Sequence, residues 1–130
     1  MNPEAIVIMP AFEIHTTSLE KIIVDANSIE ICLDDVNEER YRIVAKPYQA
    51  IKITTIDCAS SDDFHNDFCF RDGRYHRHIL QMLNSHFLKE LKEKAASFGF
   101  LTKSKHFVFP LQEIVVELIA YELNVTKQFV

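Results

Sequence analysis

Hydrophobic and polar residues alternate through the first half of the chain, as they do in β-strands that bury one face. Residues 28–34 alternate cleanly, and residues 40–45 resume the alternation after a polar turn. Because successive side chains of a strand point to opposite faces, the two segments predict an antiparallel hairpin. Glu30 and Arg42 are expected to face each other across it.

Further strands are predicted on both sides of this hairpin. Residues 5–14 carry apolar side chains of both parities, which favours a central strand, while Pro10 lacks an N–H and predicts an irregularity there. Residues 50–58 are rich in β-branched side chains and predict the third strand of a β-meander. Residues 19–28 fit either a short helix or a short strand.

One long helix is predicted from Gly73 or Arg74 to Gly99. Its apolar stripe follows a spacing of three to four residues, and lysines occupy its last turns, where they complement the helix dipole. The stripe consists of Leu80, Leu83, Phe87, Leu91 and Phe98. Such a helix would cover one face of a sheet.

The last third of the chain predicts more strands. Residues 105–109 form a short apolar run, and residues 113–125 fit a strand or an amphipathic helix, with the β-branched run at 114–116 favouring the strand. The predicted fold is therefore α+β. It is mainly an antiparallel β-sheet, a meander of about five to six strands, covered on one face by the long amphipathic helix.

Size and charge narrow the class of protein. The chain of 130 residues predicts a single globular domain, 1–130. We expect a cytoplasmic protein, because the N-terminal residues lack the pattern of a signal peptide and no run of about 18 apolar residues could span a membrane. A net charge of −5 disfavours nucleic acid as a partner and favours a basic protein.

Histidines and carboxylates gather between residues 57 and 78. Imidazole and carboxylate groups suit zinc or a similar ion, so a small metal-dependent hydrolase is the alternative function. The candidate metal ligands are His65, His76 and His78. On the predicted helix, however, positions i and i+2 point in different directions, so we expect no metal and no other cofactor.

Three cysteines, Cys32, Cys58 and Cys69, are too few and too widely spaced for a disulfide framework. We expect free thiols that are mostly buried. Cys69 precedes several basic residues, but Phe68 and Phe70 flank it and favour burial over a nucleophilic thiolate. With no catalytic motif in the chain, we do not expect an enzyme.

Two acidic groups are the candidate partner-binding surface, because charge complementarity speeds association with a basic protein. Phe64 and Tyr75 are the candidate aromatic anchors. The first acidic group is Asp34, Asp35, Glu38 and Glu39, and the second is Asp57, Asp62, Asp63 and Asp67. A homodimer formed through an exposed strand edge is a further possibility.

From Ser28 to Asn124, the order of "SIEICLDD", "RYRIVAKPYQAIKITTIDC", a basic helix and "KHFVFPLQEIVVELIA" resembles small bacterial cytosolic immunity proteins of polymorphic toxin and contact-dependent inhibition systems. This resemblance implies a non-catalytic protein that binds a cognate, basic toxin domain and occludes its active site. It assigns no functional residue.

Overall fold

The computed structural model describes residues 2–59, 66–95, 99 and 101–128. Most regular structure in these parts of the chain is β-strand, with one α-helix, α1 (His86–Lys94). The strands are β1 (Glu4–Val7), β2 (Glu13–Ile14), β3 (Lys21–Val24), β4 (Ile29–Asp34), β5 (Arg40–Ala45), β6 (Tyr48–Thr55), β7 (Phe70–Arg71), β8 (Arg74–Tyr75), β9 (Arg77–His78), β10 (Leu80–Leu83), β11 (Lys105–Pro110), β12 (Ile114–Ala120) and β13 (Leu123–Lys127).

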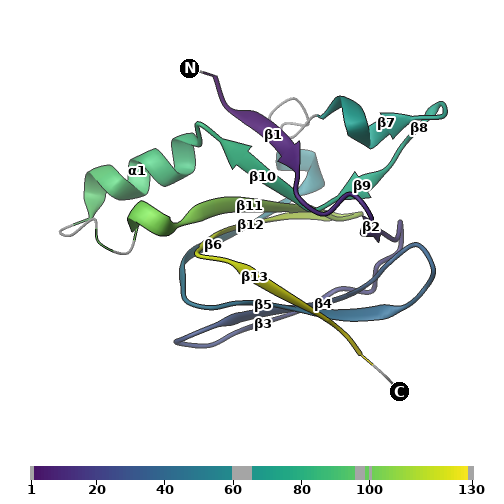
Figure 1. Cartoon of the computed structure of the whole chain (residues 1–130), viewed down its shortest axis with the longest axis horizontal. Helices are drawn as coiled ribbons and strands as arrows, with labels where there is room; N and C mark the ends of the chain where they lie inside the picture. Colours follow the sequence, from purple (N-terminus) through teal and green to yellow (C-terminus); the bar gives the residue numbers. More distant parts are fainter. Residues whose placement is uncertain (1, 60–65, 96–98, 100, 129–130) are drawn as a thin grey trace.

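The strands build two antiparallel sheets, one above the other (Figure 1). The large sheet has the strand order β1-β10-β11-β12-β6, and the small sheet has the order β13-β5-β4-β3. Two short pairs, β2 with β9 and β7 with β8, lie at the end of the molecule away from α1 (Figure 1). The α+β class and the antiparallel pairing are thus confirmed, and the arrangement is a β-sandwich with one helix.

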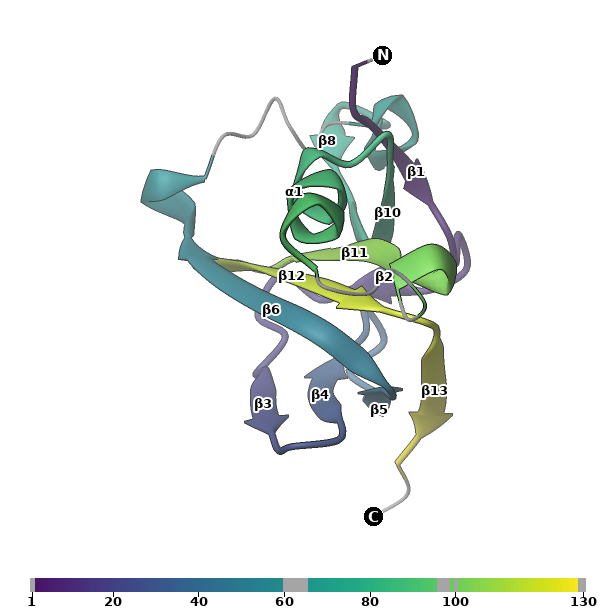
Figure 2. The same ribbon diagram turned by 90° about the vertical axis from the view of Figure 1, so that its left-hand side faces the viewer.

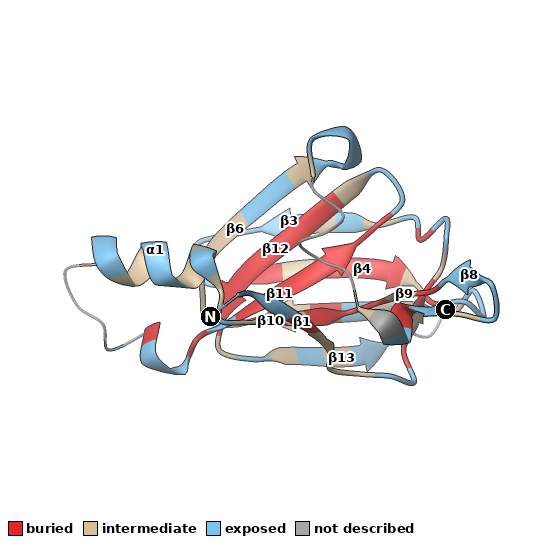
Figure 3. Ribbon diagram, turned by 90° about the horizontal axis from the view of Figure 1, so that it is seen from above, coloured by how far each residue is buried: buried red, intermediate tan, exposed pale blue. Residues whose placement is uncertain are grey.

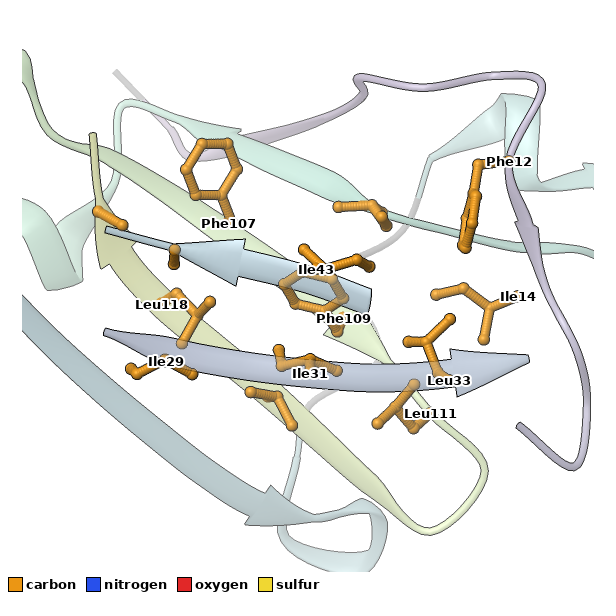
Figure 4. Close-up of a cluster of buried hydrophobic side chains, with 14 residues drawn as sticks. Phe12, Ile14, Ile29, Ile31, Leu33, Ile43, Phe107, Phe109, Leu111 and Leu118 are labelled. Carbon is orange, nitrogen blue, oxygen red and sulfur yellow. The ribbon is translucent and has the colours of Figure 1, made fainter. Parts of the chain in front are cut away.

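The core fills the space between the two sheets (Figure 4). Alternate residues of β4, β5, β11 and β12 point into it, which is why the sequence of β4 and β5 shows a period of two. From the large sheet come Phe107, Phe109, Val116 and Leu118, and from the small sheet come Ile29, Ile31, Leu33 and Ile43. The buried strands β4, β11 and β12 lie at the centre (Figure 3).

The hairpin prediction is confirmed, but the meander is wrong. β4 and β5 pair antiparallel, and Arg42 forms an ion pair with Glu30. After Pro47, however, β6 leaves the small sheet and pairs with β12 in the large sheet (Figure 2). A strand with apolar residues of both parities can join either layer, so its composition alone does not identify its neighbour.

The long helix is also wrong, because α1 has 9 residues and starts at His86. The segment before it is extended and forms β8, β9 and β10. Side chains at 76, 78, 80 and 82 are buried, which is the period of two of a strand. The apolar residues of this segment also match a helical spacing, so the sequence pattern fits both structures. The helix ends at Lys94 with Ala95 as its C-cap, well before Gly99.

Other segments follow the prediction more closely. The expected irregularity near Pro10 is confirmed, since β1 and β2 are separate strands on either side of it, but the central position is wrong, because β1 is at the edge of the large sheet. The stretch 113–125 is mostly strand, in β12 and the first part of β13, and the ambiguous segment before the hairpin contains β3. In the described part of the chain, no helix is long and apolar enough to cross a membrane.

The outer face of the large sheet has its own apolar cluster. It contains Ala5, Cys69, Leu80, Met82, Val108 and Val115. The 3-10 turn η3 (Asp67–Cys69) contributes Cys69 to it, and α1 lies over the other end of the same face (Figure 2). The outer face of the large sheet therefore carries η3 at one end and α1 at the other.

Candidate functional site

The carboxylates at the end of β4 are bound by other groups of the same chain. Asp35 is buried, and its Oδ1 accepts the backbone N–H groups of Asn37 and Glu39 at 2.9 and 3.0 Å. Asp34 forms an ion pair with Arg40 at 3.2 Å. These two residues of the first acidic group therefore stabilise the hairpin turn, and Asp35 exposes almost no carboxylate to a partner.

The other two carboxylates of this group are more accessible. Glu39 lies 2.9 Å from Lys127 Nζ, and this hydrogen bond raises the pKa of the lysine. The side chain of Glu38 is 81% exposed and 3.9 Å from His15 Nε2. Glu38 is consequently the carboxylate of the hairpin that is best placed to meet another molecule.

The structure describes only part of the second acidic group. Asp57 is exposed in the 3-10 turn η1 (Ile56–Cys58). Asp67 begins η3, but its side chain is outside the described part of the structure. The remaining predicted residues of this stretch, Asp62, Asp63, Phe64 and His65, lie outside the described residues.

His76 and His78 lie on extended backbone beside β2, not on a helix. Both are buried, and each is bound within the protein. His76 Nδ1 lies 2.8 Å from Glu13 Oε1, while His78 Nδ1 donates to Phe12 O at 2.9 Å. The prediction that a helix separates the two imidazoles is therefore wrong, but each imidazole is hydrogen-bonded to another group of the protein.

The proton positions on His78 follow from its partners. Nδ1 must donate to a carbonyl, and Nε2 accepts from Arg71 Nη1 at 3.3 Å, because an arginine can only donate. Burial lowers the pKa of His78, and the charge of Arg71 lowers it further. Among the described residues, no three His, Cys, Asp or Glu side chains gather as metal ligands, and His76 Nε2 has no hydrogen-bond partner there.

Cys69 is buried, as the sequence predicts. Burial raises the pKa of its thiol, a hydrogen bond from Tyr75 and the charge of Arg71 opposing that shift only in part. Cys32 is buried as well, whereas Cys58 is exposed, and all three are free. A raised pKa disfavours the thiolate, so the structure gives Cys69 a packing role.

Around Tyr75, large apolar side chains are exposed beside a cavity. Tyr75 is 44% exposed, Phe70 directly opposite it on β7 is 57% exposed, and Ile56 is 45% exposed. Tyr75 and Ile56 line a cavity of about 220 Å³ whose other walls include Pro110, Leu111 and Val115. We call Ile56, Phe70, Tyr75 and this cavity the Tyr75 surface.

A second set of side chains, which the sequence analysis missed, lies under the start of α1. Ser85 Oγ is hydrogen-bonded to His106 Nδ1 at 2.6 Å, and His106 Nε2 donates to Glu117 Oε1 at 2.9 Å. Glu117 Oε2 lies 3.3 Å from Lys52 Nζ. We call Ser85, His106, Glu117 and Lys52 the Ser85 network.

Local structure explains why these residues meet. Asn84, with φ of 55°, turns the chain after β10, and Ser85 then caps α1 by accepting the N–H of Leu88 at 3.0 Å. Lys52 and Glu117 are directly opposite on β6 and β12. The network therefore joins four segments that are far apart in the sequence.

Glu117 is the anionic centre of this network. Burial by itself raises the pKa of a carboxyl, but the hydrogen bond from His106 and the ammonium group of Lys52 together lower the pKa of Glu117 below its ordinary value. Lys52 Nζ also lies 4.7 Å from the centre of the Phe87 ring. The carboxylate is thus charged and fully paired although its side chain is buried.

The order of contacts, hydroxyl to imidazole to carboxylate, is that of a nucleophilic triad. Here Ser85 Oγ also accepts the Leu88 N–H, so the same hydroxyl ties the helix to the sheet. The network can therefore fix the wall of a site as well as move a proton.

A cavity of about 550 Å³ lies beside the Ser85 network, between α1 and β11. We call it the α1 cavity. Three lysines line it, Lys89 and Lys92 from α1 and Lys105 from β11, together with Ser85 and His106. In the sequence, the Ser85 network is indicated by a single carboxylate, Glu117, within the apolar run of β12, because a buried charge requires a partner.

Comparison of the chain with protein-family models, curated proteins and solved structures found no match.

Proposed function

We propose that this protein is a binding protein that neutralises a bacterial toxin domain by covering its active site, and that it docks through the Tyr75 surface. The observation that carries the proposal is that Ile56 and Tyr75 line an apolar cavity and Phe70 lies opposite Tyr75, all three being more than two-fifths exposed. Aromatic and large aliphatic side chains in such an arrangement are typical of the residues that dominate binding energy.

The cavity and the projecting side chains have complementary roles in this proposal. The volume of about 220 Å³ admits one apolar side chain of the partner between Pro110, Leu111 and Val115. Phe70 and Tyr75 then contact the partner around that side chain and exclude water from it. Removal of water from such apolar surface supplies the free energy of binding.

The net charge supports a basic partner. The chain carries a net charge of −5, and Asp57 is exposed next to Ile56, although Arg77 also lines the cavity. A basic toxin domain would be attracted over a long range by the net charge and positioned by the nearby carboxylate. Glu38 would add to the long-range attraction, whereas Asp34 and Glu39 contribute less because each has a cation beside it.

Co-expression tests the proposal. The protein is produced in cells together with the product of each neighbouring gene in its source genome, and growth is measured. We expect one of these products to be toxic and the wild-type protein to restore growth. If no neighbouring product is toxic, or if a toxic product is not neutralised, the proposed function is wrong.

A further inference from the structure

We propose that the α1 cavity binds a small organic phosphate. The inference goes beyond the proposed function, because α1, which lines this cavity, lies at the other end of the molecule from β8, which carries Tyr75 (Figure 3). It rests on the charges that line the cavity, on its size and on the side chains that form its walls.

The charges around the cavity are of one sign. Lys89, Lys92 and Lys105 line it, and no carboxylate is among the described residues that do. None of the three lysines has an ion-pair partner in the part of the chain that the structure describes. In a chain with a net charge of −5, three unpaired ammonium groups around one cavity form a local site for an anion.

The number of cations favours phosphate over a single carboxylate. A lysine is a compact point charge that can approach an anion from any direction, so the charge of the ligand decides the match. The described lining of the cavity contains lysines and no arginine. Three ammonium groups from two elements can surround a phosphate that carries two negative charges.

The remaining walls favour an organic ligand over the free ion. Met82, Leu83 and Leu88 provide apolar surface, and Asn84 and Gln81 provide amide groups. The volume of about 550 Å³ lies within the range of small-molecule sites. Inorganic phosphate alone would leave most of this apolar surface uncovered.

The Ser85 network gives the site a rigid wall. Ser85 and His106 line the cavity, and their hydrogen bond holds the start of α1 against β11. Because α1 supplies Lys89 and Lys92 while β11 supplies Lys105, this bond also fixes the relative position of the two elements that carry the three lysines. The positive end of the helix dipole at Ser85 adds to the same potential.

Isothermal titration calorimetry of the full chain with phenyl phosphate and inorganic phosphate, at constant ionic strength, tests the proposal. We expect saturable binding of phenyl phosphate at one site and weaker binding of inorganic phosphate. The double variant Lys89→Gln/Lys92→Gln should weaken phenyl phosphate binding by about tenfold or more, because it removes two charge-assisted contacts. Circular dichroism checks that each variant is folded.

The matched control is Lys94→Gln/Lys103→Gln, which removes two lysines that do not line the cavity and changes the net charge equally. It should bind phenyl phosphate as the wild type does. Equal weakening by both double variants would show attraction to the overall charge and would overturn the proposal. So would the absence of saturable binding, or inorganic phosphate binding as tightly as phenyl phosphate.

Discussion

Ser85 and His106 are joined by a hydrogen bond of 2.6 Å between the serine hydroxyl and Nδ1 of the imidazole. The same hydroxyl accepts the Leu88 N–H, so one oxygen both caps α1 and links it to β11. A helix of 9 residues has little stability of its own, and its position depends on such tertiary contacts.

Ser85→Ala should therefore lower the free energy of unfolding by about 1–2 kcal/mol, because it removes a helix cap and leaves His106 Nδ1 without its hydrogen-bond partner. Ser85→Thr keeps the hydroxyl and should lose less. Urea unfolding of the three proteins measures the difference. Equal stability of the wild type and Ser85→Ala would show that the bond does not hold the helix.

Glu117 should make the fold sensitive to acid. Its pKa is lower in the folded protein than its ordinary value of 4.5, so its contribution is complete above about pH 4.5 and is lost as the pH falls through the folded value. Glu117→Gln keeps an acceptor for His106 without a titrating group. The difference in unfolding free energy between wild type and Glu117→Gln should shrink on acidification below about pH 4.5, and a difference independent of pH would refute this role.

His78 should stay neutral in the folded protein where an unfolded chain is already protonated. Its pKa is lowered from 6.5, chiefly by burial, so the unfolded state takes up a proton first and stability declines as the pH falls below about 6.5. Nuclear magnetic resonance of the imidazole nitrogens measures this directly. A His78 signal that titrates at or above pH 6.5 would contradict the structure.

The three cysteines should react at different rates with a maleimide. Cys58 is exposed in η1, whereas Cys32 and Cys69 are buried and the pKa of Cys69 is raised. Mass spectrometry of the native protein should show rapid modification of one thiol, and Cys58→Ser should abolish it. Rapid labelling of Cys69 would mean that the segment over the large sheet opens readily.

Modification of Cys58 also bears on the proposed docking face, since Cys58 belongs to the same turn as Ile56. A bulky maleimide at Cys58 should weaken binding of the toxin domain by at least about tenfold through steric exclusion. The Cys58→Ser variant, treated with the same maleimide, is the control for labelling at other sites. Unchanged affinity after complete modification of Cys58 would place the docking face elsewhere.

The sequence predicts strands best where one face of the strand is buried and the other is exposed to solvent. Ile29, Ile31 and Leu33 all point into the core, so the period of two in β4 is visible in the sequence. The segment from 76 to 83 matches a helical spacing because Ile79 and Leu83 add apolar positions to a strand whose even-numbered residues are buried. Strands with apolar residues on both faces lose the signal that separates strand from helix.

The site was harder to predict because its members meet only through the fold. Lys52 and Glu117 lie opposite each other only because β6 pairs with β12, and this pairing depends on the change of sheet after Pro47. Ser85 joins them from the turn at Asn84, where the sequence predicts the interior of a long helix instead. Tyr75 was identified from its residue type, but its neighbour Phe70 and the apolar cavity follow from the β7–β8 pair and from the packing of η1.

The most direct test of the proposed function is the affinity of two matched variants for the toxin domain identified by co-expression. Ile56→Asp places a charge on the Tyr75 surface, and Val24→Asp places the same charge on β3, at a residue that is 50% exposed. Titration calorimetry should show that Ile56→Asp weakens binding by about a hundredfold or more, while Val24→Asp binds as the wild type does. Wild-type affinity of Ile56→Asp, or equal weakening by both variants, would contradict docking through the Tyr75 surface.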